Sequence, residues 1–85
     1  MKIEGGMGKS KEDAIIIKDV NNGFEGIGVE YEWLRNAYGV KDVDWSLQLQ
    51  SLISDDHSAR VYDLLELKLK SSEIIKVWFD ITDFY

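Results

Sequence analysis

The sequence predicts an α+β fold in which one helix packs on a mainly antiparallel sheet, with the elements in the order strand, helix, strand, strand, strand. Three observations predict it: a β-branched run, then one stretch of helical periodicity, then apolar and polar alternation through the second half of the chain. The length of 85 residues is enough for one hydrophobic core. We therefore expect a single domain built of one helix and one sheet.

The first ordered element is predicted after a glycine-containing segment. Residues 1–13 carry three glycines and no periodic apolar pattern, so we expect a flexible lead-in ahead of a single domain at 14–85. The β-branched run at 14–17 predicts a buried strand that ends near Val20. The Asn-Asn-Gly sequence at 21–23 then breaks this strand.

One amphipathic helix is predicted between Phe24 and Tyr38, where apolar residues recur with helical spacing. Gly39 is placed to end it as the left-handed residue after the last turn. Val29 and Trp33 fall on the opposite side, so we expect them to be exposed. The predicted core face consists of Phe24, Ile27, Tyr31, Leu34 and Tyr38.

Three strands are predicted beyond residue 42, each with its odd-numbered side chains facing the helix. In an antiparallel hairpin, the odd-numbered side chains of both strands face the same side only if the residue numbers of each opposed pair sum to an even value. We therefore predict an odd-length loop around 54–58 and a loop of three or five residues around 70–73. The expected inward side chains include Val43, Trp45, Leu47, Leu49, Ile53, Val61, Leu65, Leu67, Leu69, Ile75, Val77, Phe79 and Ile81.

The composition limits the classes of partner. Sixteen acidic and ten basic residues give a formal charge of -6, which disfavours nucleic acid and anionic membranes and would steer a basic protein toward the chain. The chain has no cysteine, so disulfides, thiolate metal sites and thiol nucleophiles are excluded. No segment has the pattern of a secretory signal or a membrane span, and we expect a cytoplasmic protein by default.

Two polar motifs are candidate sites of chemistry. Residues 5–10 end like a phosphate-binding loop, but Ile3 stands where the first glycine should lie and no strand is predicted before the loop. His57, the only histidine, follows Asp55 and Asp56 in a segment typical of a polar turn between strands. We therefore expect no metal site and no cofactor.

Asp63 is the carboxylate most relevant to a binding site, because its odd number places it on the core side near a strand end. A pocket between helix and sheet, with Asp63, His57 or Tyr31 supplying the polar group, would make the protein a small ligand-binding protein or enzyme. This is the alternative to an interaction module.

The aromatic residues predict two apolar surface patches. One is formed by Val29 and Trp33 on the outer helix face, and the other by Tyr62, Leu64 and Trp78 on the outer sheet face. Large exposed aromatic side chains are enriched where proteins meet. The competing explanation is that the N-terminal arm or the two C-terminal residues cover one patch. Our first expectation is a non-enzymatic, acidic protein-interaction module, either a homodimer or an immunity-like inhibitor of a basic partner.

Several short motifs resemble small uncharacterised bacterial proteins. The shared features are a glycine-rich lead-in, the sequence Glu-Tyr-Glu-Trp-Leu at 30–34 and a closing Phe-Asp-Ile at 79–81. The resemblance spans most of the chain and implies no activity and no functional residue. It suggests that Glu30, Tyr31 and Asp80 be examined for shared contacts, because short polar signatures inside apolar elements often fix a hydrogen-bond network.

Overall fold

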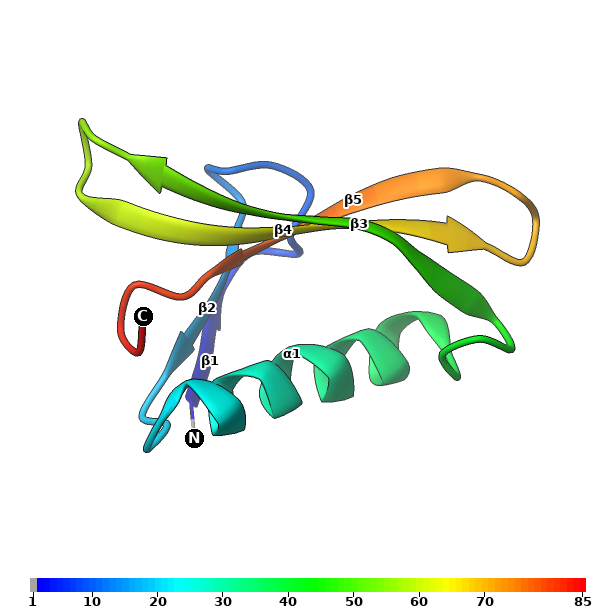
Figure 1. Cartoon of the computed structure of the whole chain (residues 1–85), viewed down its shortest axis with the longest axis horizontal. Helices are drawn as coiled ribbons and strands as arrows, with labels where there is room; N and C mark the ends of the chain where they lie inside the picture. The colour runs from blue at the N-terminus through cyan, green and yellow to red at the C-terminus, as the bar shows by residue number, and fades with distance from the viewer. Residues whose placement is uncertain (1) are drawn as a thin grey trace.

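The computed structural model describes residues 2–85 and places one helix against one face of a five-stranded sheet (Figure 1). The strand order is β1-β2-β5-β4-β3, with β2 and β5 parallel and the other neighbours antiparallel. The α+β fold and the order of the predicted elements are confirmed. The elements are β1 Lys2–Gly5, β2 Ile15–Lys18, α1 Gly23–Tyr38, β3 Trp45–Asp55, β4 Arg60–Leu69 and β5 Ile74–Asp80.

The ends of α1 follow from its capping residues. The Asn22 side chain accepts a hydrogen bond from the Glu25 amide at 2.8 Å, which satisfies a donor of the first turn. Gly39 has φ 105° and donates its N–H to the Arg35 carbonyl at 3.0 Å. A glycine in this conformation ends the helix at the predicted position.

An additional strand, β1, precedes the predicted elements. The expectation of a lead-in with no folded element is wrong for Lys2–Gly5, which pairs antiparallel with β2. The loop that follows turns back through hydrogen bonds from Gly6 N to Ala14 O and from Gly8 N to Asp13 O, at 3.1 and 2.8 Å. A strand therefore does precede the glycine-rich segment, but the loop leads into another strand and not into the helix that a phosphate-binding loop requires.

The core-facing side of α1 differs from the predicted one. Its buried residues are Gly26, Val29, Glu30 and Leu34, whereas Phe24 is 89 % exposed. At 100° per residue the observed face is rotated by roughly 100° from the predicted stripe. The apolar pattern was misleading because a glycine and a glutamate occupy the centre of the face that packs on the sheet.

Val29 and Trp33 therefore do not form the predicted exposed patch. Val29 is buried in the core, and the half-buried Trp33 packs edge-on against Phe79 with ring centroids 5.8 Å apart. This contact links the middle of α1 to the central strand β5. The fully buried core side chains are Ile15, Ile17, Leu34, Leu65, Leu67, Val77 and Phe79.

The predicted side-chain parity holds for β4 and β5. Leu65 pairs with Val77, and both side chains are buried on the helix side. Leu69 N donates to Glu73 O at 2.8 Å, so the turn between them has three residues. Its last residue, Ser72, has φ 76°, the left-handed conformation expected at this position of a three-residue hairpin.

The parity prediction is wrong for most of β3. Asp55 pairs with Arg60, so this loop has an even number of residues, and the register shifts between Leu47 and Leu49. The β-bulge at the shift keeps Trp45 and Leu47 on the helix side but moves Leu49 to the outer face. Ile53 also moves outward and pairs with Tyr62, whereas Gln50 and Leu52 move inward.

The outer sheet face is partly covered by the loop between β1 and β2, which lies on the side opposite α1 (Figure 1). Gly8 O accepts a hydrogen bond from Trp78 N, and Lys11 Nζ lies 2.8 Å from an oxygen of Asp55. Tyr62 packs edge-on against Trp78 at 5.9 Å and is only 7 % exposed. Tyr62 thus lies on the predicted face but not in water, in agreement with cover by the N-terminal arm.

Candidate functional site

A cavity of about 320 Å³ opens between the first half of α1, the strands β3 and β4, and the C-terminal segment. Its walls are mostly apolar, and three polar side chains from three different elements converge on it. The lining residues are Gly23, Ile27, Glu30, Gln50, Leu52, Asp63, Ile81, Phe84 and Tyr85. This is the pocket between helix and sheet that the ligand-binding alternative requires, and Asp63 lines it.

Glu30 and Asp63 form a buried carboxyl pair in this cavity, 1 % and 5 % exposed respectively. Burial, followed by a hydrogen bond and the charge of Asp63, raises the pKa of Glu30 to about 10. Glu30 therefore keeps its proton at neutral pH and shares it with Asp63. The other oxygen of Glu30, Oε2, is buried without a hydrogen-bond partner.

Gln50 completes the polar group from β3. Its Nε2 atom donates to both oxygens of Asp63, at 3.0 and 2.9 Å. One amide group therefore contacts both oxygens of Asp63. Because Glu30 keeps its proton beside the charge of Asp63, the three side chains hold one shared proton and one negative charge inside an apolar cavity.

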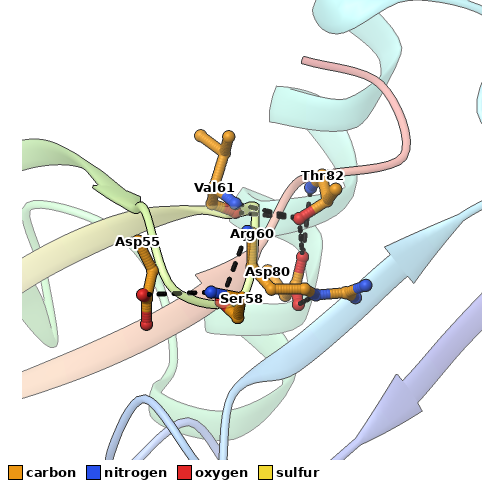
Figure 2. A network of polar contacts seen from close by, with 6 residues as sticks. All are labelled: Asp55, Ser58, Arg60, Val61, Asp80 and Thr82. Atoms are coloured by element: carbon orange, nitrogen blue, oxygen red, sulfur yellow. Dashed lines mark hydrogen bonds and ion pairs between the residues drawn. The ribbon is translucent and has the colours of Figure 1, made fainter.

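The C-terminal wall of the cavity is fixed by a polar network at the start of β4 (Figure 2). The buried carboxylate of Asp80 accepts hydrogen bonds from Arg60 Nε at 2.7 Å and from Thr82 Oγ1 at 2.6 Å. The same Thr82 hydroxyl accepts from Val61 N at 2.9 Å. These contacts direct the last residues back toward α1, where the Phe84 ring packs against Gly26.

The turn at 55–58 is stabilised by its own side chains (Figure 2). Asp55 Oδ1 accepts from the backbone amides of His57 and Ser58, at 3.0 and 3.3 Å. The hydrogen bond from Lys11, together with the one from the His57 amide, lowers the pKa of Asp55 to about 2. His57 itself is exposed and lies in this turn, as the polar-turn interpretation predicts.

The other polar candidates lie apart from the carboxyl pair. Tyr31 stacks on Trp45 with centroids 6.4 Å apart and lines a different cavity, of about 470 Å³, together with Arg35 and Lys41. Asp80 belongs to the network with Thr82. The structure gives separate partners to Glu30, Tyr31 and Asp80, the residues that the resemblance marked for examination.

The free edge of β3 is the second feature with functional character. Residues 45–54 carry no charged side chain, and no other run of the chain without charge is as long. Among the described residues, β3 pairs along its length only with β4, apart from one bridge between Trp45 and Lys41. Leu49 projects from the outer face of this edge and is 54 % exposed.

Sequence reasoning found Asp63, named Glu30 only together with Tyr31 and Asp80, and missed Gln50. A glutamate at the centre of a helix whose neighbours four residues away are Gly26 and Leu34 was a usable signal for Glu30, because such a position faces the core if its neighbours do. Gln50 had no such signal, since its inward position results from the even-length loop after Asp55 together with the bulge that precedes it.

No protein-family model, curated protein or solved structure matches the chain. Within residues 2–85, no helix has the length and apolar character needed to cross a bilayer. In the same residues, no three His, Asp or Glu side chains gather in an arrangement that could hold a metal ion.

Proposed function

We propose that the protein is an interaction module that self-associates by pairing the free edge of β3 with the same strand of a second copy. The observation that carries the proposal is the uncharged run at 45–54 on an edge strand. Edge strands usually avoid pairing with other chains through charged side chains, proline or very short length. β3 has eleven residues and none of these features between Trp45 and Ser54.

The charge distribution supports a second copy as the occupant. Two chains of formal charge -6 repel each other, so a symmetric contact must avoid facing carboxylates. An antiparallel pair of these strands places uncharged side chains opposite one another along almost the whole contact. If the protein instead inhibited a basic partner through this strand, the strand would be expected to carry acidic residues.

The pairing would extend the sheet across two molecules through main-chain hydrogen bonds. Leu49 on the outer face and Leu52 on the helix face would add apolar contact on both sides of the shared edge. A two-fold axis through β3 produces a closed dimer, since each edge is then used once.

Light scattering after size-exclusion chromatography, at two protein concentrations, tests the proposal. We expect the mass of a dimer for the wild type and of a monomer for Leu49→Lys, because a lysine at an edge opposes pairing. Ile74→Lys is the matched control, since Ile74 is 50 % exposed and lies on β5, away from this edge. It should remain a dimer. A wild-type monomer at both concentrations, or equal behaviour of the two variants, would refute self-association through β3.

Cysteine cross-linking would locate the two-fold axis. The chain has no cysteine, so single-cysteine variants at positions 49 to 52 report only on the introduced thiol. We expect one of them to form a covalent dimer rapidly on oxidation, since facing residues near an antiparallel axis approach within disulfide distance. Ser72→Cys, in the turn between β4 and β5, is the control. Its covalent dimer should form only slowly, through random encounters between molecules.

A second candidate function is that of a small ligand-binding protein. The specific observation in its favour is the cavity that contains Glu30, Gln50 and Asp63, since a few convergent polar groups in an apolar cavity are typical of ligand sites.

A further inference from the structure

We propose that the cavity beside Glu30 and Asp63 binds an organic cation through a guanidinium group. This inference deepens the ligand-binding candidate and does not depend on pairing of the β3 edges, so the two can fail separately. Three features of the cavity support it: the unpartnered oxygen of Glu30, the charge of the carboxyl pair, and the shape and composition of the walls.

The unpartnered oxygen of Glu30 indicates that a hydrogen-bond donor is missing from the cavity. Oε2 is buried and accepts no hydrogen bond, although its residue lines the cavity. A buried acceptor without a partner costs about 1 to 3 kcal/mol, which a ligand N–H would recover. The donor must come from outside the described chain, because the Gln50 amide is already directed at Asp63.

The charge of the pair selects a single positive charge. One proton is shared between Glu30 and Asp63, which leaves one negative charge in an apolar environment. A monocation with several N–H donors would neutralise this charge and reach both carboxyl groups, as a planar guanidinium does with its fork of donors. The overall charge of -6 raises the concentration of cations near the surface.

The walls of the cavity fit the remainder of such a molecule. A volume of about 320 Å³ is close to the lower end of small-molecule sites, which begin at about 300 Å³. Ile27 and Leu52 offer apolar contact to a short alkyl chain, and Phe84 and Tyr85, which also line the cavity, are aromatic residues of the kind on which a guanidinium stacks. A divalent metal ion fits less well, because the cavity supplies few of the six or more oxygen ligands that it prefers.

Titration of the full chain with n-butylguanidinium at neutral pH, followed by amide chemical shifts and calorimetry, tests the inference. We expect saturable binding, with the largest shifts at Glu30, Gln50 and Asp63. n-Butylurea, which is neutral and nearly the same shape, should bind at least about tenfold more weakly, a difference of about 1.4 kcal/mol. Equal affinity for the two molecules, or saturation by Ca²⁺ in place of the guanidinium, would overturn the proposal.

Three variants assign the binding to this cavity. Asp63→Asn should weaken butylguanidinium binding at least about tenfold. Glu32→Gln removes the same charge from an exposed position on the same helix and should leave the affinity unchanged. If Asp63→Asn fails to fold, Ile27→Trp tests the site instead. Its larger side chain fills the cavity from a partly exposed position and leaves the carboxyl pair in place. Unchanged binding in Ile27→Trp would refute the site.

The shared proton gives a further test of the charge match. A monocation neutralises the one negative charge of the pair and leaves the shared proton in place, so the binding enthalpy at neutral pH should not depend on the buffer. Glu30→Gln keeps the charge of Asp63 and should also bind without proton release. Release of a proton when butylguanidinium binds to the wild type would contradict a cavity that holds a single negative charge.

Discussion

The ring of Phe84 occupies the space in which a β-carbon on Gly26 would lie. This contact joins the C-terminal segment to the first half of α1 and closes one side of the cavity that contains Glu30 and Asp63. Gly26 is thus required for a close approach between a helix backbone and an aromatic ring, although glycine is a poor helix former.

Replacement of Gly26 by alanine is expected to destabilise the protein. Alanine would favour the helix by about 1 kcal/mol, but its methyl group would displace the Phe84 ring, and overpacking of this kind costs about 1 to 3 kcal/mol. Urea unfolding should therefore show no gain, or a net loss of up to about 2 kcal/mol. Gly28→Ala is the control, because the space that its new methyl group would enter is open, with no packed neighbour within 4 Å. It should stabilise by about 1 kcal/mol, and equal gains in the two variants would contradict a steric role of Phe84.

The buried carboxyl of Glu30 predicts an unusual pH dependence of stability. Its pKa is raised from 4.5 to about 10 on folding, so between these values the folded chain holds a proton that the unfolded chain has lost. The free energy of unfolding should therefore fall as the pH rises through this range, by up to about 1.4 kcal/mol per pH unit from this group. The contribution of Glu30 is fully present only below the unfolded pKa.

Glu30→Gln should remove this dependence, because an amide keeps the hydrogen-bond donor to Asp63 without titrating. We expect the variant to be more stable than the wild type at about pH 8 and its stability to vary less with pH. Glu32→Gln, at an exposed position, should retain the wild-type slope. Parallel curves for Glu30→Gln and the wild type, measured by urea unfolding at several pH values, would disprove the protonated state of Glu30.

Thr82 is predicted to be the main polar support of the C-terminal segment. Thr82→Val removes the hydroxyl that donates to Asp80 and accepts from Val61 N, and it leaves the buried carboxylate of Asp80 with fewer donors. We expect a loss of about 1 to 3 kcal/mol in the free energy of unfolding. Ser71→Ala, in the exposed turn before β5, should change it by less than about 0.5 kcal/mol. A similar loss in both variants would refute the role of the network.

Two single-residue deletions test the bulge in β3. Without Gln48, Leu47 and Leu49 become neighbours and every observed pair with β4 can persist, so Gln50 still reaches Asp63. Without Gln50, Gln48 no longer lies in a bulge but pairs with Glu66, and Leu49 takes the inward position opposite Leu65. The second deletion should be less stable than the first by about 1 to 3 kcal/mol, since Asp63 loses its amide donors. The reverse order in urea unfolding would contradict the assigned register.

The sequence predicted those elements whose signals are local. The helix, its end at Gly39, and the hairpin between β4 and β5 follow from periodicity and turn chemistry within a few residues. Strand β1 was missed because four residues carry too little periodicity, and its order depends on pairing with β2.

The candidate site was only partly predictable because it depends on two exceptions to regular patterns. Asp63 was found from strand parity, which holds throughout β4. The helix face was misassigned because the buried Glu30 interrupts the apolar stripe, and a carboxyl is tolerated there only through its proton and its partner. Gln50 was predicted to face outward because an odd-length loop was expected after β3. The loop after Asp55 has an even number of residues, and the Asp55 side chain stabilises it.

The parallel contact between β2 and β5 has a consequence for the order in which the chain can fold. Ile15 pairs with Phe79, and β5 stands between the N-terminal hairpin and the hairpin of β3 and β4. As a ribosome makes the five strands in sequence, the central one emerges last. We therefore expect the apolar faces of both hairpins to stay exposed during synthesis, until β5 pairs with β2 and β4 in one late folding step.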